Sequence, residues 1–381
     1  MLTLNENLRE AAPESYTRAR LTPGMALFAY FVLGLLETVV AYFVFDRTDD
    51  HYYFLSIANT GTSVVPLTGV EAYDLKAIFA AYVFYWITLP SRLLGGNELT
   101  HLLWLRGLTL LGFYAAFEAV KSGSSLARWA PREQVETRRN LFLWAVLLFP
   151  AQIAWTASLL RDGISCALLF FAIYLWRGRW KLFALPLLGA SLSLRPEFVL
   201  VPVCLAGARW IMRYRWCARN PGTCLLLLCV VGSLLCFEPR YASSQFSLAV
   251  FTGLAYPDVT SLFDVPGYLA VALQGLIDPL PITNLAAPSA FGMAETIFFL
   301  VLLVLAMRAL GKMNTNEKAR AVASLLLLWF FAYFESFVSS YSRHRIALVV
   351  LLMAVVVCSG YRPRYRLKPV RVADSGAACF P

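Results

Sequence analysis

The first apolar stretch, residues 24–45, reads GMALFAYFVLGLLETVVAYFVF. It contains one charged side chain, Glu37. As a helix it would extend about 33 Å, enough to cross the roughly 30 Å hydrocarbon core of a membrane. It follows a polar N-terminal segment and is too long for the apolar core of a signal peptide, so no cleavable signal is expected. This stretch therefore predicts a transmembrane helix.

The composition of the whole chain extends that prediction. Hydrophobic residues make up 59% of the 381 residues and charged residues 15%, whereas a typical soluble domain is about 25% charged. These values exclude a soluble globular domain, a coiled coil and a disordered chain. We expect an all-α, polytopic transmembrane bundle with about 10–11 apolar segments. The segments lie at about 24–45, 76–94, 101–120, 140–158, 163–176, 181–195, 197–210, 223–237, 294–310, 321–338 and 346–360.

Lys and Arg predict the orientation, because cytoplasmic loops retain them. Of the 33 Lys and Arg residues, 24 fall in six clusters, and we expect all six to be cytoplasmic. The tails 1–23 and 361–381 are then both cytoplasmic and flank a membrane domain, 24–360. The high pI then reflects membrane orientation and contact with anionic lipid, not nucleic-acid binding. The predicted outer loops are 46–100, 159–162, 238–293 and 339–345.

This orientation places a demand on two ambiguous runs. The run 76–94 must not change sides by itself, so it must be re-entrant, lie in the interface, or pair with part of 51–67. The stretch 181–210 must cross twice or dip in and return, with Arg195 and Pro196 at the turn. Each half is only about 22 Å long as a helix. A broken or tilted hairpin is therefore expected, with the break at a proline that lacks an amide donor.

One group of ionisable residues lies where the first helix leaves the membrane, in the sequence Asp-Arg-Thr-Asp-Asp-His of residues 46–51. Asp49 and Asp50 could simply be a solvated helix end. Alternatively, one of them is a general base, or a carboxylate that binds a divalent metal, because adjacent carboxylates raise each other's pKa. No pattern in the sequence identifies a metal or another cofactor.

Two further groups lie between or within apolar runs. Arg161 and Asp162 occupy a short predicted turn, either as a solvated pair with Asp162 as a helix cap, or directed into a cavity where they contact substrate. Arg195 and Glu197 lie in the middle of a long apolar stretch, where a charge costs about 2.5–3.5 kcal/mol. Arg195 is expected to pair with Glu197 or Asp162, or to bind a phosphate through its guanidinium group.

The last group is Arg343, His344 and Arg345, in the last predicted outer turn. Basic residues are otherwise scarce on that side, which indicates an anionic partner. A lipid headgroup is the simpler interpretation, and a substrate phosphate or diphosphate is the more specific one.

Four short stretches resemble segments of GT-C membrane glycosyltransferases, including bacterial O-antigen and exopolysaccharide polymerases. The opening of the first outer loop, TDDHYYFLSIANTG, is similar to the start of those enzymes. The apolar run SLSLRPEFVLVPV also resembles GT-C enzymes. The stretch FPAQIAWTASLLRDGISCALLFFAIYLW is similar to the Pro…Ser-x-x-Arg/Lys-Asp segment of bacterial polysaccharide-assembly proteins, and the late SRHRIALVV is similar to the closing Arg-Tyr/His segment that precedes their last spans. The tail after residue 360 is short and basic, so we expect a protein like the compact polymerase-like members and not like the many enzymes of this type that carry a large C-terminal domain.

The resemblance implies an enzyme of the bacterial inner membrane that takes sugar from a polyprenyl-phosphate or polyprenyl-diphosphate donor on the outer face and passes it to a glycan acceptor. Its partners would be membrane lipids and other polysaccharide-assembly proteins. It implies Asp49 or Asp50 as base and Arg161 and Asp162 as second-loop charges. It also implies that lipid phosphate is held by Arg195, Arg343 and Arg345.

The sequence leaves three questions of function open. The first is whether the enzyme is a single-sugar transferase or a polymerase, because both would carry the same residues. A transporter or flippase of lipid-linked saccharides is the alternative from another class, and it should show paired broken helices and a polar path to both faces. A non-catalytic scaffold is the third, against which the intramembrane charges Glu37 and Arg195 argue.

Overall fold

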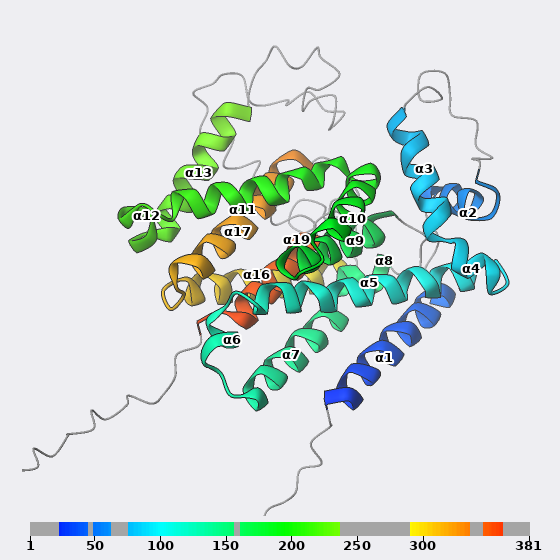
Figure 1. Cartoon of the computed structure of the whole chain (residues 1–381), viewed down its shortest axis with the longest axis horizontal. Helices are drawn as coiled ribbons and strands as arrows, with labels where there is room; N and C mark the ends of the chain where they lie inside the picture. The colour runs from blue at the N-terminus through cyan, green and yellow to red at the C-terminus, as the bar shows by residue number, and fades with distance from the viewer. Residues whose placement is uncertain are drawn as a thin grey trace, which may run out of the picture.

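The computed structural model describes residues 23–44, 49–61, 75–155, 161–236, 290–335 and 346–360. In these ranges it contains helices and no strand, which confirms the all-α prediction for this part of the chain (Figure 1). The helices are α1 (Pro23–Val44), α2 (Asp49–Thr60), α3 (Leu75–Ile87), α4 (Leu89–Leu93), α5 (Glu98–Lys121), α6 (Ser125–Trp129), α7 (Arg132–Leu147), α8 (Pro150–Trp155), α9 (Arg161–Arg177), α10 (Lys181–Leu194), η2 (Pro196–Val199), α11 (Leu200–Ile211), α12 (Arg215–Arg219), α13 (Pro221–Cys236), α16 (Ala290–Leu310), α17 (Thr315–Glu335) and α19 (Ile346–Cys358).

Helix α5 defines the two ends of the bundle, which we call the Glu98 end and the Lys121 end. Helix α1 is antiparallel to α5, because Tyr30 Oη donates to the Leu110 carbonyl at 3.1 Å while the later Glu37 pairs with the earlier Arg106. Helix α9 is parallel to α5, since it starts beside Thr109 and Arg177 donates to the Ala119 carbonyl. The first residue of α1, Pro23, therefore lies toward the Lys121 end of the bundle.

Long-range hydrogen bonds tie helix ends together at the Lys121 end. Arg138 of α7 donates to the Val357 carbonyl of α19 at 2.6 Å. Arg320 of α17 donates to the Val120 carbonyl of α5 at 2.8 Å. Lys318 donates to the Ala218 carbonyl, after α11. Four basic clusters, 121–139, 177–181, 209–219 and 308–320, therefore gather at the same end, where α1 also begins and α19 ends.

Helices α2, α3 and α4 lie in sequence between α1, which ends at the Glu98 end, and α5, which begins there. Helices α2 and α3 pack against each other. With 12 and 13 residues they are about 18–20 Å long, too short to cross a membrane singly. Of the three arrangements predicted for the run 76–94, the contact between α2 and α3 is compatible with its pairing with part of 51–67.

Proline interrupts two of the predicted apolar segments. Helix α10 ends at Leu194, and the chain passes Arg195 and the short η2 before α11 begins, as predicted for 181–210. The run 140–158 differs from the prediction of one continuous segment. Helix α7 ends at Leu147 and α8 begins at Pro150. The amide nitrogen of Pro150 carries no proton, so it cannot continue the ladder of helix α7.

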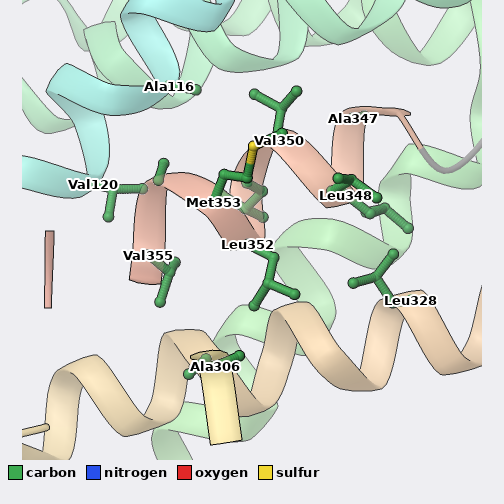
Figure 2. Packing of buried hydrophobic residues seen from close by; sticks show 14 of the residues in the cluster. Ala116, Val120, Ala306, Leu328, Ala347, Leu348, Val350, Leu352, Met353 and Val355 are labelled. Carbon is green, nitrogen blue, oxygen red and sulfur yellow. The ribbon is translucent and has the colours of Figure 1, made fainter. Parts of the chain in front are cut away.

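Helix α19 lies in the middle of the main hydrophobic core, and its side chains from Ile346 to Val355 are all buried. Figure 2 shows Val350, Leu352 and Met353 of α19 between neighbouring helices. The neighbours contribute several small residues, which let helix backbones approach closely. Core residues from these neighbours are Ala116 and Val120 of α5, Ala306 of α16 and Leu328 of α17.

Helices at the periphery leave large apolar side chains exposed. Helix α1 exposes Met25, Phe28, Val32, Leu36 and Val40, which form one stripe along its length. Two described helices, Gly24–Val44 and Glu98–Lys121, are long and apolar enough to cross a membrane, and five more apolar helices have 10–17 residues. Soluble monomers rarely expose contiguous apolar surface of this extent.

Helices α5 and α9 cross in close contact at Gly112. A Cβ atom on Gly112 would overlap the backbone of Ala167, whereas a Cβ atom on Gly107, also in α5, would meet nothing within 4 Å. Gly112→Ala should therefore force the helices apart and destabilise the protein by about 1–3 kcal/mol. Gly107→Ala should leave stability unchanged or raise it by up to about 1 kcal/mol through helix propensity. Thermal unfolding of both variants in one detergent would test this, and equal melting temperatures would contradict it.

Candidate functional site

A second hydrophobic cluster, at the Glu98 end, joins helices that are far apart in sequence. Phe54 and Ile57 of α2 pack there with Phe84 of α3. The cluster also holds Ile164, near the start of α9, and Leu194, the last residue of α10. Burial of these large side chains is the physical reason why α2 lies beside the junction of α9 and α10.

An ion pair between Asp162 and Arg195 lies at that junction. Only 6% of Asp162 and 8% of Arg195 is exposed, so the pair is removed from solvent. Of the alternatives predicted for Arg195, the structure contains the pairing with Asp162. One turn away, Ser165 Oγ donates to the Ser191 carbonyl at 2.9 Å and Ser191 Oγ donates to the Ser165 carbonyl at 2.8 Å. These reciprocal bonds hold α9 and α10 in register, so the guanidinium group is fixed in position.

A second buried ion pair joins α1 and α5. Arg106 is 4% exposed, and its Nη2 lies 3.0 Å from Glu37 Oε2. Its Nε also donates to the Gly34 carbonyl at 3.2 Å. Glu37 was predicted from the sequence as an intramembrane charge, whereas its partner Arg106 was not. The sequence did indicate that Arg106 is paired, because it is a charged residue within the apolar run 101–120 and such residues need an internal partner.

The first turn of α2 is fixed against the first turn of α5. His51 is fully buried, and its Nε2 lies 3.0 Å from Glu98 Oε1. Asp49 and Asp50 are the two residues before His51 and form the start of α2. Their side chains lie outside the described part of the structure. Their backbone therefore lies at the Glu98 end, close to the beginning of α5.

A further chain of polar residues, from buried Ser91 and His101 to exposed Asn59, links α4, α5 and α2. His101 Nδ1 lies 2.6 Å from Ser91 Oγ, and His101 Nε2 lies 3.0 Å from Asn59 Oδ1. A serine, a histidine and an amide in a row resemble the parts of a nucleophilic triad. However, the Ser91 hydroxyl donates to the Thr88 carbonyl at 2.7 Å, and both Ser91 and His101 are fully buried. The arrangement therefore links helices instead of activating Ser91.

The remaining predicted residues are only partly placed. Arg161 is the first residue of α9 and Glu197 lies in η2, but the side chains of both are outside the described part. Arg343, His344 and Arg345 lie outside the described residues altogether. Among the side chains that are described, no group of three or more His, Cys, Asp or Glu residues is arranged to hold a metal ion.

Among the described residues, the Asp162–Arg195 pair lies at the start of α9, beside Thr109 near the middle of α5, and the Glu37–Arg106 pair lies about one helical turn nearer the Glu98 end. Such buried charges are costly at membrane depth and are typical of functional sites. Comparison of the chain with protein-family models, with curated proteins and with solved structures found no match in any of the three.

Proposed function

We propose that the chain is a multi-pass protein of the bacterial inner membrane, with the Glu98 end outside and the Lys121 end in the cytoplasm. The exposed apolar stripe of α1 and the apolar core around α19 support an environment of lipid. The gathering of four basic clusters at the Lys121 end supports this orientation, as does the start of α1 and the end of α19 at that same end. Both tails would then be cytoplasmic.

We further propose that the protein is a GT-C-like glycosyltransferase or polysaccharide polymerase of surface-glycan assembly. The observation that carries this proposal is the buried Asp162–Arg195 pair, which one hydrophobic cluster joins to the helix that begins with Asp49 and Asp50. The buried guanidinium group is the candidate phosphate site, and the start of α2, whose later residues share the hydrophobic cluster with Leu194, carries the candidate base.

In the proposed reaction, Asp49 or Asp50 removes the proton from an acceptor hydroxyl while that oxygen attacks the anomeric carbon of the donor sugar. The bond from that carbon to the phosphate oxygen breaks, and polyprenyl phosphate or diphosphate leaves. Arg195 stabilises the charge of the leaving group without a proton transfer, and Asp162 positions Arg195. The other proposed substrate contacts are Arg161, Glu197, Arg343, His344 and Arg345.

A transporter or flippase is the second candidate, and the centre of the described bundle argues against it. Helix α19 is apolar along its length and fully packed from Ile346 to Val355. It therefore offers no polar path between the Glu98 end and the Lys121 end.

A gel of surface glycan from cells that lack the protein, compared with complemented cells, tests the proposal. Loss of the long-chain ladder with a single repeat retained would identify a polymerase. Loss of all glycan, with a truncated saccharide on the lipid carrier at the outer face, would identify a single-sugar transferase. Complete lipid-linked repeats trapped on the cytoplasmic face would identify a flippase instead, and unchanged glycan would refute a role in this process.

A further inference from the structure

A cavity of about 350 Å³ lies between α9, α10 and α11. It is distinct from the candidate site, because it extends from the Lys121 end. Its wall along α9 runs from Leu169 to Arg177, a depth of about 12 Å by helix rise. Apart from two arginines its lining is apolar or aromatic, and representative lining residues are Leu169, Trp176, Leu188, Pro202, Leu205 and Ala206.

The two arginines of the cavity lining are Arg177 of α9 and Arg209 of α11. A third, Arg320 of α17, joins Arg177 in the lining of a smaller adjacent cavity. Arg177 is subject to the positive charges of both Arg320 and Arg209. In the described part of the chain, the ion pairs involve other residues, and none of these three arginines contacts a carboxylate.

The three arginines differ in how many of their N–H donors form hydrogen bonds within the protein. Arg177 donates to the Ala119 carbonyl, and Arg320 donates to the Val120 and Gly123 carbonyls, so both bind the last carbonyls of α5. Arg209 is exposed. A guanidinium group has five N–H donors, so Arg209 and the remaining donors of Arg177 are available to an anion at the cavity.

The cavity also lies at the level expected for a membrane surface. Trp176, in its lining, and Trp210, next to Arg209, are both more than half exposed. Tryptophan concentrates at the depth of lipid headgroups. A lipid in this position would have its phosphate beside the arginines and its chains beside the apolar wall.

We propose that this cavity binds an acidic phospholipid, with the headgroup phosphate against Arg177 and Arg209 and part of an acyl chain between α9, α10 and α11. The lining that holds Arg177 and Arg209 contains no carboxylate, and its net positive charge favours an anionic lipid over a zwitterionic one. Basic pockets between helices on the cytoplasmic side are suited to such headgroups. The proposal rests on the membrane location but not on sugar transfer.

Native mass spectrometry of the purified full-length chain in detergent, titrated with phosphatidylglycerol or phosphatidylcholine, would test the proposal. Phosphatidylglycerol should bind at least fivefold more tightly. Arg209→Gln should weaken phosphatidylglycerol binding about fivefold, as expected for one basic residue at a lipid headgroup. Arg213→Gln, which removes an exposed arginine just after α11 and outside the cavity lining, is the matched control and should bind like the unaltered protein.

Filling the cavity tests the acyl-chain part of the proposal. Ala206 is an exposed residue of the lining, so Ala206→Phe should occupy the cavity and weaken binding of both lipids. Glycerol phosphate, which has the headgroup phosphate without acyl chains, should bind far more weakly than phosphatidylglycerol. Equal losses for Arg209→Gln and Arg213→Gln would overturn the proposal, as would equal affinity for the two lipids or for glycerol phosphate. Neither result would bear on the glycan assay.

Discussion

Asp49→Asn and Asp50→Asn, introduced one at a time, are expected to lower glycan synthesis about 10²–10⁴-fold for the residue that acts as the base. Asparagine keeps the size and polarity of aspartate but cannot accept a proton at neutral pH. The neighbouring carboxylate should show a much smaller effect, because only one of the two takes the proton. Both lie in the first turn of α2, which the His51–Glu98 contact fixes against α5.

The measurement is the glycan ladder in cells that carry each variant in place of the unaltered protein. Glu133→Gln is the matched control, because it removes an exposed carboxylate at the Lys121 end. It should leave the ladder unchanged. Membrane levels of all variants must be compared, so that loss of protein is separated from loss of chemistry. A full-length ladder from both aspartate variants at normal levels would refute the assignment of the base.

Arg195→Met is expected to destabilise the bundle by about 3–5 kcal/mol, because it leaves the Asp162 carboxylate buried without its partner. The double variant Asp162→Leu/Arg195→Met should recover much of that loss, since removal of both charges also removes the cost of burying them. The double variant should still fail in glycan synthesis, because no guanidinium group then holds the donor phosphate. Recovery of stability without recovery of activity separates the two roles of Arg195.

Unfolding free energies of the four members of this double-mutant cycle, measured in one detergent, give the coupling between the two residues. The Arg132–Glu136 pair of α7 is the matched control, because Arg132 is 89% exposed and the pair is four residues apart on one helix. Its removal should cost at most about 0.5 kcal/mol. Equal costs for Arg195→Met and Arg132→Met would show that the Asp162–Arg195 pair is not buried in the working protein.

Much of the secondary structure could be predicted from the sequence, because helix formation and helix breaking depend on neighbouring residues. Two apolar runs long enough for a helix predicted α1 and α5. Pro196 predicted the end of the helix that precedes it. The distribution of Lys and Arg predicted that 76–94 would not change sides of a membrane alone, and this stays a prediction. The break at Pro150 was missed because the apolar run continues on both sides of it.

By itself, the sequence determined a helical chain with basic clusters between apolar runs and with charges too costly to leave without partners. Only the tertiary structure decided the partners. Arg195 pairs with Asp162, Glu37 pairs with Arg106, and α19 is central although other helices are nearly as apolar. Hydropathy is a property of each segment alone, whereas these pairings depend on which helix surfaces fit closely enough to cross, as α5 and α9 do at Gly112.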